Sequence, residues 1–385
     1  MLWNSHRASD SGDSYFSTRQ TLNETEFRRL ISGESTGATA VLLRAMLRCL
    51  SVCYRLIVAA RNAGYQYRWL AIHRTHVPVI SIGNITTGGT GKTPVVALVV
   101  HLLQSAGRIP GIISRGYRSD VSGTNDEYRV LAAHCPGVPH EQHRDRVMAA
   151  ERLQQTHPIN AIVMDDGFQH RRLHRDLDIV LIDLSNPFGY GFLLPRGLLR
   201  EPLSALKRAD IVLLTRCDVV SAEHLQHTEE LLLRLMPHLS ENLFPLQFAP
   251  AGVIDTLGNR CGIEILQGKR VFLMCAVGNP EAFVRTCENA GAVVAGHHFF
   301  SDHHHYSDND LAVVQNEFLR SGADLVLTTQ KDLVKLPPER ADILAIELTA
   351  QFVRDGDSQR FAQRIRSALA NSQNETSSIN RTHES

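Results

Sequence analysis

Five short apolar runs, rich in valine and isoleucine and separated by longer segments, constrain the fold of this chain most strongly. The runs are PVISIG, GIIS, AIVMDD, DIVLID and DIVLLT, and they lie between residues 78 and 215. They show no in-and-out alternation, which is typical of strands that are buried on both faces of a parallel sheet. Helical segments separate the runs, so the pattern predicts a doubly wound α/β fold with a mainly parallel sheet.

A second series of apolar runs follows and predicts a second, smaller α/β unit. Its runs are RVFLMCAV, AVVAGHHFF, DLVLTT and DILAIEL, again separated by helical stretches. The segment that joins the two series, residues 244–267, contains proline, glycine and asparagine, which are typical of loops. We interpret it as the connection between the two units. We therefore expect a first domain over residues 63–250 and a smaller α/β domain over residues 251–368.

Both ends of the chain are polar and show little apolar periodicity. Such segments cannot bury enough apolar surface to offset the entropy of ordering. We expect a disordered N-terminal extension over residues 1–36 and a disordered tail over residues 369–385.

An amphipathic helix is predicted between the N-terminal extension and the first domain, over residues 37–62. One stripe of this helix is polar and basic, with Arg44, Arg48, Ser51, Arg55 and Asn62. The opposite stripe is apolar, with Leu42, Met46, Cys49, Cys53, Ile57 and Ala60. This pattern suits a helix in a membrane interface with arginine toward anionic head groups, and it equally suits a helix packed on its own domain.

Charge and cysteine content exclude several classes of protein. Lys and Arg number 40 and Asp and Glu number 40, so the chain lacks the net positive charge expected of a generic nucleic-acid binder. Its 7 cysteines have no CxxC spacing, which argues against a disulfide framework or a zinc ribbon and favours a reducing compartment. No stretch of about 20 residues is free of charge, which argues against a spanning helix, and the polar N-terminus is unlike a secretion signal.

The most specific motif is GNITTGGTGKTP, residues 83–94, which follows the first apolar run and precedes an apolar helix. A P-loop needs this context, because its glycines let backbone N–H groups surround phosphate oxygens at a helix N-terminus. Lys92 would reach the β- and γ-phosphates of a nucleoside triphosphate, and the Thr93 hydroxyl would bind Mg²⁺. Thr86 stands where the strict GxxxxGK[ST] pattern has its first glycine. The nucleotide-binding residues predicted on the loop are Thr86, Thr87, Gly88, Gly89, Thr90, Gly91, Lys92 and Thr93.

Charged residues at the ends of neighbouring strands add to this prediction. Asp165 and Asp166 end the run AIVMDD, where a Walker B carboxylate would approach Mg²⁺. Arg115 follows the run GIIS and would project into the same crevice, at the edge where open α/β sheets bind ligands. For Arg115 a phosphate contact and a surface ion pair both fit the sequence.

Two other functional classes share some of these features. A membrane-associated ATPase that switches a partner protein would share the loop, the strand-end Asp and the amphipathic helix. Its deviant P-loop normally carries an additional lysine early in the motif, and residues 86–89 contain none. A GTP-binding protein is suggested by LTRCD, residues 214–218, but arginine replaces the lysine expected there.

Eight motifs in register carry a resemblance to a known family. They are GNITTGGTGKTP, ISRGY, NDEYRVLA, MDDGFQHRRLHRDLDIVLID, FGYGFLLPRGLLREP, AVGNPEAF, FSDHHHY and TTQKDLVKL. In order and wording they resemble the tetraacyldisaccharide 4′-kinases of lipid A biosynthesis, over roughly residues 40 to 340. The resemblance implies an enzyme that transfers the γ-phosphate of ATP to the 4′-hydroxyl of a tetraacyldisaccharide 1-phosphate, giving lipid IVA.

The resemblance also implies roles for individual residues. It places Lys92 and Thr93 on ATP and Mg²⁺, and it makes the threonine at position 86 a family trait. It assigns the catalytic base to Asp126, assisted by His303. The positions that it places in or near the metal and nucleotide site are Asp165, Asp166, Gln169 and Glu201.

The substrate that the resemblance implies also decides the role of the amphipathic helix. A lipid with four acyl chains leaves a bilayer only at great cost, because each exposed CH₂ costs about 0.8 kcal/mol. We therefore expect residues 37–62 to anchor the enzyme peripherally on the cytoplasmic face of the inner membrane, with arginines near lipid or substrate phosphates. We expect no nucleic acid as a partner of this enzyme, and the sequence leaves its oligomeric state open.

We also expect the second α/β unit to carry His303 to the P-loop domain.

Overall fold

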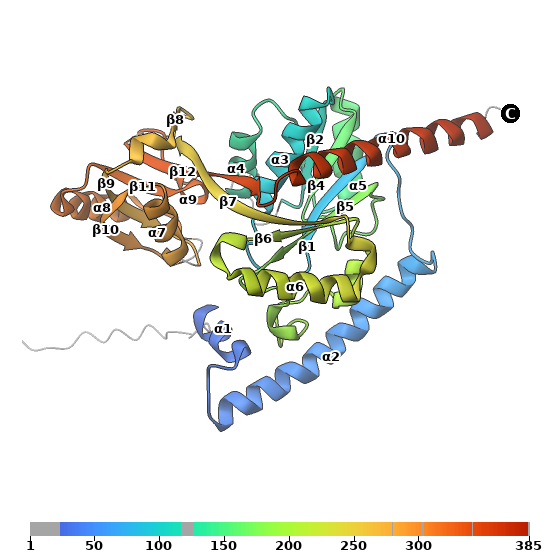
Figure 1. Ribbon diagram of the computed structural model, residues 1–385, viewed down its shortest axis with the longest axis horizontal. Helices are drawn as coiled ribbons and strands as arrows, with labels where there is room; N and C mark the ends of the chain where they lie inside the picture. Colours follow the sequence, from blue (N-terminus) through green and yellow to red (C-terminus); the bar gives the residue numbers. More distant parts are fainter. Residues whose placement is uncertain (1–23, 117–125, 279, 302–303, 341, 384–385) are drawn as a thin grey trace, which may run out of the picture.

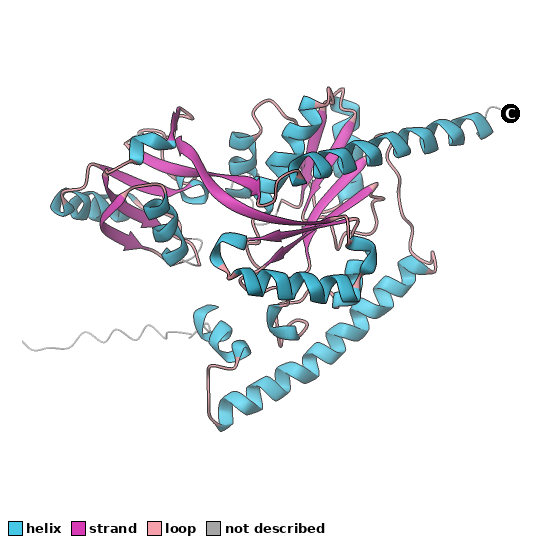
Figure 2. Cartoon of the chain, viewed as in Figure 1, coloured by secondary structure: helices cyan, strands magenta, loops and turns pink. Residues whose placement is uncertain are grey.

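The computed structural model of the chain describes residues 24–116, 126–278, 280–301, 304–340 and 342–383 (Figure 1). One continuous mixed sheet runs through the molecule (Figure 2). Its strands are β1 (Val79–Asn84), β2 (Pro110–Ser114), β3 (His140–Gln142), β4 (Ala161–Asp165), β5 (Leu177–Asp183), β6 (Ile211–Thr215), β7 (Leu243–Ile254), β8 (Arg260–Gly262), β9 (Arg270–Cys275), β10 (Val293–Phe299), β11 (Leu325–Thr329) and β12 (Ile343–Phe352).

The strand order is β10-β9-β11-β12-β7-β6-β5-β1-β4-β2-β3, and β8 pairs with β7 off this path. All neighbouring pairs from β3 to β7 and from β10 to β12 are parallel. The predicted strands β1, β2, β4, β5 and β6 are fully buried, as their uninterrupted apolar sequences require. The expected doubly wound, mainly parallel α/β fold is therefore confirmed.

The sheet has two halves: the first half runs from β3 to β7 in the strand order, and the second half runs from β10 to β12. The two halves meet where β7 pairs with β12 in the antiparallel sense. The first residues of β7 pair in parallel with β6, from Leu243 opposite Val212, and its later residues pair with β12 as far as Ile254 opposite Ala345. The segment that was expected to connect two separate units is thus largely a strand that belongs to both. Pro245 and Pro250 misled the prediction, because proline is normally excluded from a central strand.

The helices are α1 (Glu24–Ser32), α2 (Ala38–Gln66), α3 (Lys92–Ser105), α4 (Asp126–His134), α5 (Arg146–Thr156), α6 (Ala222–Leu235), α7 (Pro280–Asn289), α8 (Asp308–Ser321), α9 (Gln330–Leu333) and α10 (Asp357–His383). Short 3₁₀ helices are η1 (Gly189–Gly191), η2 (Leu203–Arg208), η3 (Cys217–Val219), η4 (Pro237–Leu239) and η5 (Ile263–Leu266). In the first half of the sheet, α3, α4 and α10 share one apolar core with the strands. The cores formed with α5 and with α6 are separate from it.

The C-terminal helix α10 differs from the predicted boundaries. Its residues Phe361, Ile365 and Leu369 are buried in the core of the first half, beside Phe244 of β7. Their i, i+4, i+8 spacing places them on one face of the helix. The chain therefore returns to the first half after β12, and the segment expected as a disordered tail from residue 369 is helical as far as His383.

The predicted amphipathic helix is present as α2, which extends along one side of the molecule (Figure 1). A shorter helix, α1, precedes it and ends at Ser32, inside the segment expected to be disordered. Leu30 and Ile31 of α1 are buried.

Candidate functional site

The predicted P-loop joins β1 to α3 at the point where the strand order reverses, because β1 has β4 on one side and β5 on the other. This is the place where open α/β sheets bind ligands. Gly88 and Gly91 have φ values of 116° and 83°, a region that disfavours residues with a side chain. A Cβ at Gly91 would lie 2.1 Å from Cζ of Phe248, so this position also has no room for one.

Neighbouring segments hold the loop in place from both sides. On one side the Thr87 N–H donates to the Leu198 carbonyl at 2.7 Å, and the Arg200 N–H donates to the Ile85 carbonyl at 2.7 Å. On the other side the Arg216 guanidinium donates to the Gly89 carbonyl at 2.7 Å. These contacts fix the backbone before any ligand binds, as a preorganised anion site requires.

Lys92 is the first residue of α3, and its side chain is 16% exposed. Its Nζ is 3.6 Å from Oδ1 of Asp166 and 3.4 Å from Oδ1 of Asn84. Asp166 also accepts from Arg200 at 2.8 and 3.0 Å. Burial opposes ionisation of Asp166, but the Lys92 and Arg200 cations outweigh it and hold the pKa of this carboxyl below its usual range.

Asp165 ends β4 and differs from Asp166 in its surroundings. Within the described residues, its Oδ1 is buried and has no hydrogen-bond partner. Burial raises the pKa of this carboxyl to about 7, the Lys92 ammonium acts in the opposite direction, and the Glu127 carboxylate raises the pKa further. A buried carboxylate oxygen with no donor is costly unless a cation occupies the adjacent space.

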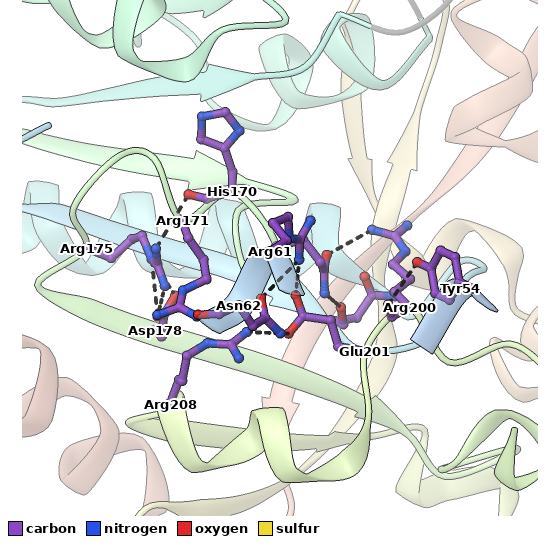
Figure 3. A network of polar contacts seen from close by, with 12 residues as sticks. Tyr54, Arg61, Asn62, His170, Arg171, Arg175, Asp178, Arg200, Glu201 and Arg208 are labelled. Atoms are coloured by element: carbon purple, nitrogen blue, oxygen red, sulfur yellow. Dashed lines mark hydrogen bonds and ion pairs between the residues drawn. The ribbon is translucent and has the colours of Figure 1, made fainter. Parts of the chain in front are cut away.

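Gln169 and Glu201 were also expected near the metal. Gln169 lies at the crevice, where its Nε2 donates to the Asn84 carbonyl at 2.9 Å and its Oε1 accepts from Arg200 at 3.3 Å. Glu201 is fully buried, but both its oxygens are taken: Oε1 pairs with Arg61 of α2 and Oε2 with Arg208, each at 2.6 Å (Figure 3). The structure thus gives Glu201 two guanidinium partners, of which Arg61 joins α2 to the body of the protein and Arg208 belongs to η2.

Asp126 is the first residue of α4, and its side chain is about one-third exposed at 30%. Its Oδ2 lies 3.8 Å from the ammonium of Lys335, which belongs to the second half of the sheet. Glu127, the next residue, is close enough to Asp165 to influence its pKa, so α4 begins near the strand-end carboxylates. Arg115 follows β2 and is exposed. His303, the predicted partner of Asp126, lies outside the described residues.

Sequence reasoning missed several residues that shape this site. Asn84 ends β1 and is fully buried, with its amide donating to the Thr86 carbonyl at 2.8 Å and its oxygen accepting from Lys92. Arg200 bridges Asp166 and Gln169, and Arg216 pairs with Asp183 while it caps the loop. Asn84 and Arg200 stand inside quoted motifs, and Arg216 is the arginine that made the guanine-reading motif a poor match.

The orientation of α2 also differs from expectation. Part of its polar stripe faces the protein: Ser51 is buried and donates to the Leu193 carbonyl at 2.9 Å, and Arg44 donates to the Ser35 carbonyl at 2.7 Å. Arg48 and Arg55 of the same stripe are exposed. Eight large apolar side chains of α2 are exposed, and they are Val41, Leu42, Leu43, Met46, Leu50, Val52, Leu56 and Ile57. We call these eight residues the outer face of α2. Burial of polar side chains with exposure of apolar ones is the reverse of a helix that only packs on its own domain.

None of the helices in the described parts of the chain combines the length and apolar character needed to cross a bilayer. Those parts also contain no group of three or more His, Cys, Asp or Glu side chains arranged to hold a metal ion.

Comparison with known proteins gives consistent matches over most of the chain. The profile of the family described as tetraacyldisaccharide-1-P 4′-kinase matches residues 43–370. The tetraacyldisaccharide 4′-kinase of Anaeromyxobacter sp. (strain Fw109-5) is 39% identical over 353 residues, covering 86% of this chain and 93% of that protein. The protein of the same name from Geobacter metallireducens is 37% identical over 316 residues, covering 77% and 90%.

A solved structure is also similar to this chain. The apo form of LpxK from Aquifex aeolicus, determined as a crystal structure in complex with ATP, has a TM-score of 0.69 and 27% sequence identity. The match covers 85% of this chain and 99% of that one.

Proposed function

The chain belongs to the tetraacyldisaccharide-1-P 4′-kinase family, and we propose how its residues divide the work of that reaction. The protein is a kinase of lipid A biosynthesis that transfers the γ-phosphate of ATP to the 4′-hydroxyl of a tetraacyldisaccharide 1-phosphate. The observation that carries the assignment of the site is the glycine loop between β1 and α3, which presents Lys92 at the switch point of the sheet.

The loop supplies the binding site for the triphosphate. The backbone N–H groups of residues 88–91 would surround the phosphates, while the Thr87 N–H is held by the Leu198 carbonyl, and the N-terminus of α3 adds its dipole. The Lys92 ammonium now lies beside Asp166 and Asn84, from which it can turn toward the β- and γ-phosphates. Arg115, at the end of β2, extends the positive charge of the crevice toward a phosphate group.

Mg²⁺ fits the residues of this crevice. The hydroxyl of Thr93 and the unpartnered Oδ1 of Asp165 offer two oxygen ligands, and burial of Asp165 leaves this carboxyl in need of a cation. Bound with ATP, the ion would neutralise charge on the β- and γ-phosphates. Asp166 and Gln169 are tied to Arg200 and would orient the surrounding ligands, while Glu201 would support the site through its ion pair with Arg61 of α2.

Asp126 is the residue that we assign as base. A sugar hydroxyl is a poor nucleophile near neutral pH, so a carboxylate must accept its proton while the hydroxyl is aligned with the γ-phosphorus. Asp126 begins α4 next to Glu127, whose charge acts on Asp165, and this supports a position for the base near the strand-end carboxylates. We keep His303 as its proposed helper on the strength of the family motif alone.

We also propose that the enzyme works at the cytoplasmic surface of the inner membrane, with the outer face of α2 in the bilayer interface. Each large apolar side chain that moves from water into the acyl region contributes about 1.5–3 kcal/mol. This differs from the sequence interpretation, because Arg44 and Arg61 of α2 bind the protein and the outer face offers apolar side chains to lipid. The substrate's acyl chains lie in the same layer, so the enzyme reaches the disaccharide without extracting the lipid.

Calorimetric titration with ATP, with and without Mg²⁺, tests the proposed metal ligands. We expect Mg²⁺ to strengthen ATP binding to the wild type and to do so far less in Asp165→Asn and Thr93→Val. Asp218→Asn is the matched control, because Asp218 also follows a strand of the first half but is exposed. Equal Mg²⁺ enhancement in Asp165→Asn and the control would refute the ligand assignment.

A further inference from the structure

A buried lysine lies between the two halves of the sheet, outside the set of residues assigned to the reaction. Lys335 follows α9, and its side chain is 5% exposed. Its Nζ is 3.0 Å from Oδ1 of Asp332, 3.3 Å from the His304 carbonyl and 3.8 Å from Oδ2 of Asp126. A buried ammonium is costly to maintain, so such a residue is retained only with charged or hydrogen-bonding partners.

Asp332 is the fixed end of this arrangement. It is fully buried, and its Oδ2 accepts from the Ala276 N–H at 2.9 Å and from the Thr329 hydroxyl at 2.7 Å. Lys335 supplies the third donor, at Oδ1. A carboxylate held by a backbone amide, a hydroxyl and an ammonium has little freedom, so it fixes the position of the ammonium as well.

The helix that carries Asp126 is attached to the same region at other points. Arg129 of α4 donates to the Val334 carbonyl at 3.0 Å, and His134 contacts Oε1 of Gln330 at 2.9 Å. The first turn of α4 and its last turn are therefore both tied to the segment around α9. Asp126 faces Lys335 as part of this junction, and not as an isolated surface pair.

We propose that Lys335 is a positioning residue for the kinase reaction, which acts by holding the carboxylate of Asp126 in place from the second half of the sheet. The inference rests on the proposed role of Asp126 as base. A base must keep a fixed geometry toward the hydroxyl, and a displacement of about 1 Å can lower the rate on the order of 100-fold. The proposal also explains the family motif TTQKDLVKL, because Asp332 orients Lys335 and Lys335 orients the base.

The same contact joins the second half of the sheet to the site in a specific manner. Lys335 donates to the carbonyl of His304, the residue that follows His303 in the sequence. One ammonium thus contacts the backbone of the FSDHHHY motif and the carboxylate of the NDE motif. The two motifs that the family resemblance assigns to the chemistry are linked through this single side chain.

Steady-state kinetics on the full-length enzyme in detergent test the inference, with ATP·Mg²⁺ and tetraacyldisaccharide 1-phosphate. We expect Lys335→Met to lower kcat about 100-fold with little change in KM for ATP, and Lys335→Arg to restore most of that loss. In an Asp126→Asn background, Lys335→Met should cause no further loss, because the residue it positions is already absent. Arg340→Met is the control, since it removes a surface Arg–Asp pair of the same half and should leave kcat unchanged.

Removal of Lys335 leaves Asp332 buried without its cation and could unfold the second half. The paired variant Asp332→Asn with Lys335→Met avoids this, because both charges leave together. We expect it to keep the thermal transition of the control and still to lose kcat. Wild-type kcat in this folded variant, or losses that multiply in the Asp126→Asn background, would overturn the inference. If instead Asp126→Asn kept full turnover, the base assignment itself would fail.

Discussion

Arg61 of α2 and the fully buried Glu201 form an ion pair at 2.6 Å, across 140 residues of sequence. Tyr54 of the same helix donates to the Arg200 carbonyl at 2.9 Å, next to Glu201 (Figure 3). The side chain of Arg200 in turn holds Asp166 in the crevice. The helix with the exposed apolar face is therefore attached to the segment that shapes the phosphate-binding site.

Replacement of Arg61 by methionine is expected to loosen α2 and destabilise the protein. It leaves a buried carboxylate with Arg208 as its main charged partner, and loss of one member of a buried ion pair costs about 3 kcal/mol. Urea unfolding followed by circular dichroism should show an earlier transition. Arg55→Met, an exposed arginine on the same helix, is the control and should change little. A transition for Arg61→Met that coincides with the control would contradict the anchoring role.

The outer face of α2 predicts the membrane behaviour. The double variant Leu56→Glu, Ile57→Glu places two charges on this face. The side chains of Leu56 and Ile57 are 65% and 68% exposed, so the fold should persist in the variant. Its binding to lipid should weaken, because two apolar side chains have been replaced by charged ones. Flotation with vesicles of phosphatidylethanolamine and phosphatidylglycerol measures this directly. Leu319→Glu on α8, a residue 68% exposed, tests whether any surface charge has the same effect. Equal loss of vesicle binding in both proteins would refute the role of α2.

Acid should destabilise the protein partly through His140. Its ring contacts the Ser114 hydroxyl at 2.8 Å and stacks on Tyr128. Burial, assisted by the charge of Arg146, lowers the pKa of this imidazole to about 4. In the unfolded chain this imidazole binds a proton near pH 6.5, whereas in the folded chain it stays neutral down to about pH 4. The free energy of unfolding therefore falls as the pH decreases from about 6.5 to about 4.

The measurement is urea unfolding of the wild type and His140→Gln at pH 7.5 and pH 5. The wild type should lose about 2 kcal/mol more between these pH values than the variant, which has no imidazole to protonate at this position. His170, whose pKa burial also lowers to about 4, contributes equally to both proteins. Identical losses in the two proteins would show that His140 is not held neutral by the fold.

Asp126→Ala should separate turnover from nucleotide binding. The carboxylate lies at the start of α4 and not on the P-loop, so its loss should lower kcat by about 100-fold or more while ATP affinity changes little. Calorimetry with ATP and rate measurement with the lipid substrate report the two quantities. Wild-type turnover in Asp126→Ala would remove this residue from the chemistry.

Local pattern predicted the strands well, because apolar runs such as residues 161–165 can be buried on both faces only in a parallel sheet. It missed β7, because prolines at 245 and 250 disguise a strand whose two parts pair with different neighbours. It also missed the burial of α10, although Phe361 and Ile365 show helical spacing, because the polar residues beyond them dominate the composition.

In the candidate site, too, features set by local sequence were predictable and features set by long-range contacts were not. The P-loop and the strand-end carboxylates were predictable, since local sequence sets both. The difference between Asp165 and Asp166 was not, because it depends on Arg200, which lies 34 residues away from Asp166. The partners of Glu201 and the contacts of Arg44 and Arg61 with the protein likewise arise only when the chain is folded.

Transfer of label from ATP to lipid tests the central claim most directly. Purified protein is incubated in detergent with Mg²⁺, tetraacyldisaccharide 1-phosphate and ATP labelled at the γ-phosphate, and the lipids are separated by thin-layer chromatography. The wild type should produce a labelled lipid with one additional phosphate, and Lys92→Ala should produce almost none. Label released only as inorganic phosphate, or equal lipid labelling by Lys92→Ala, would contradict the account.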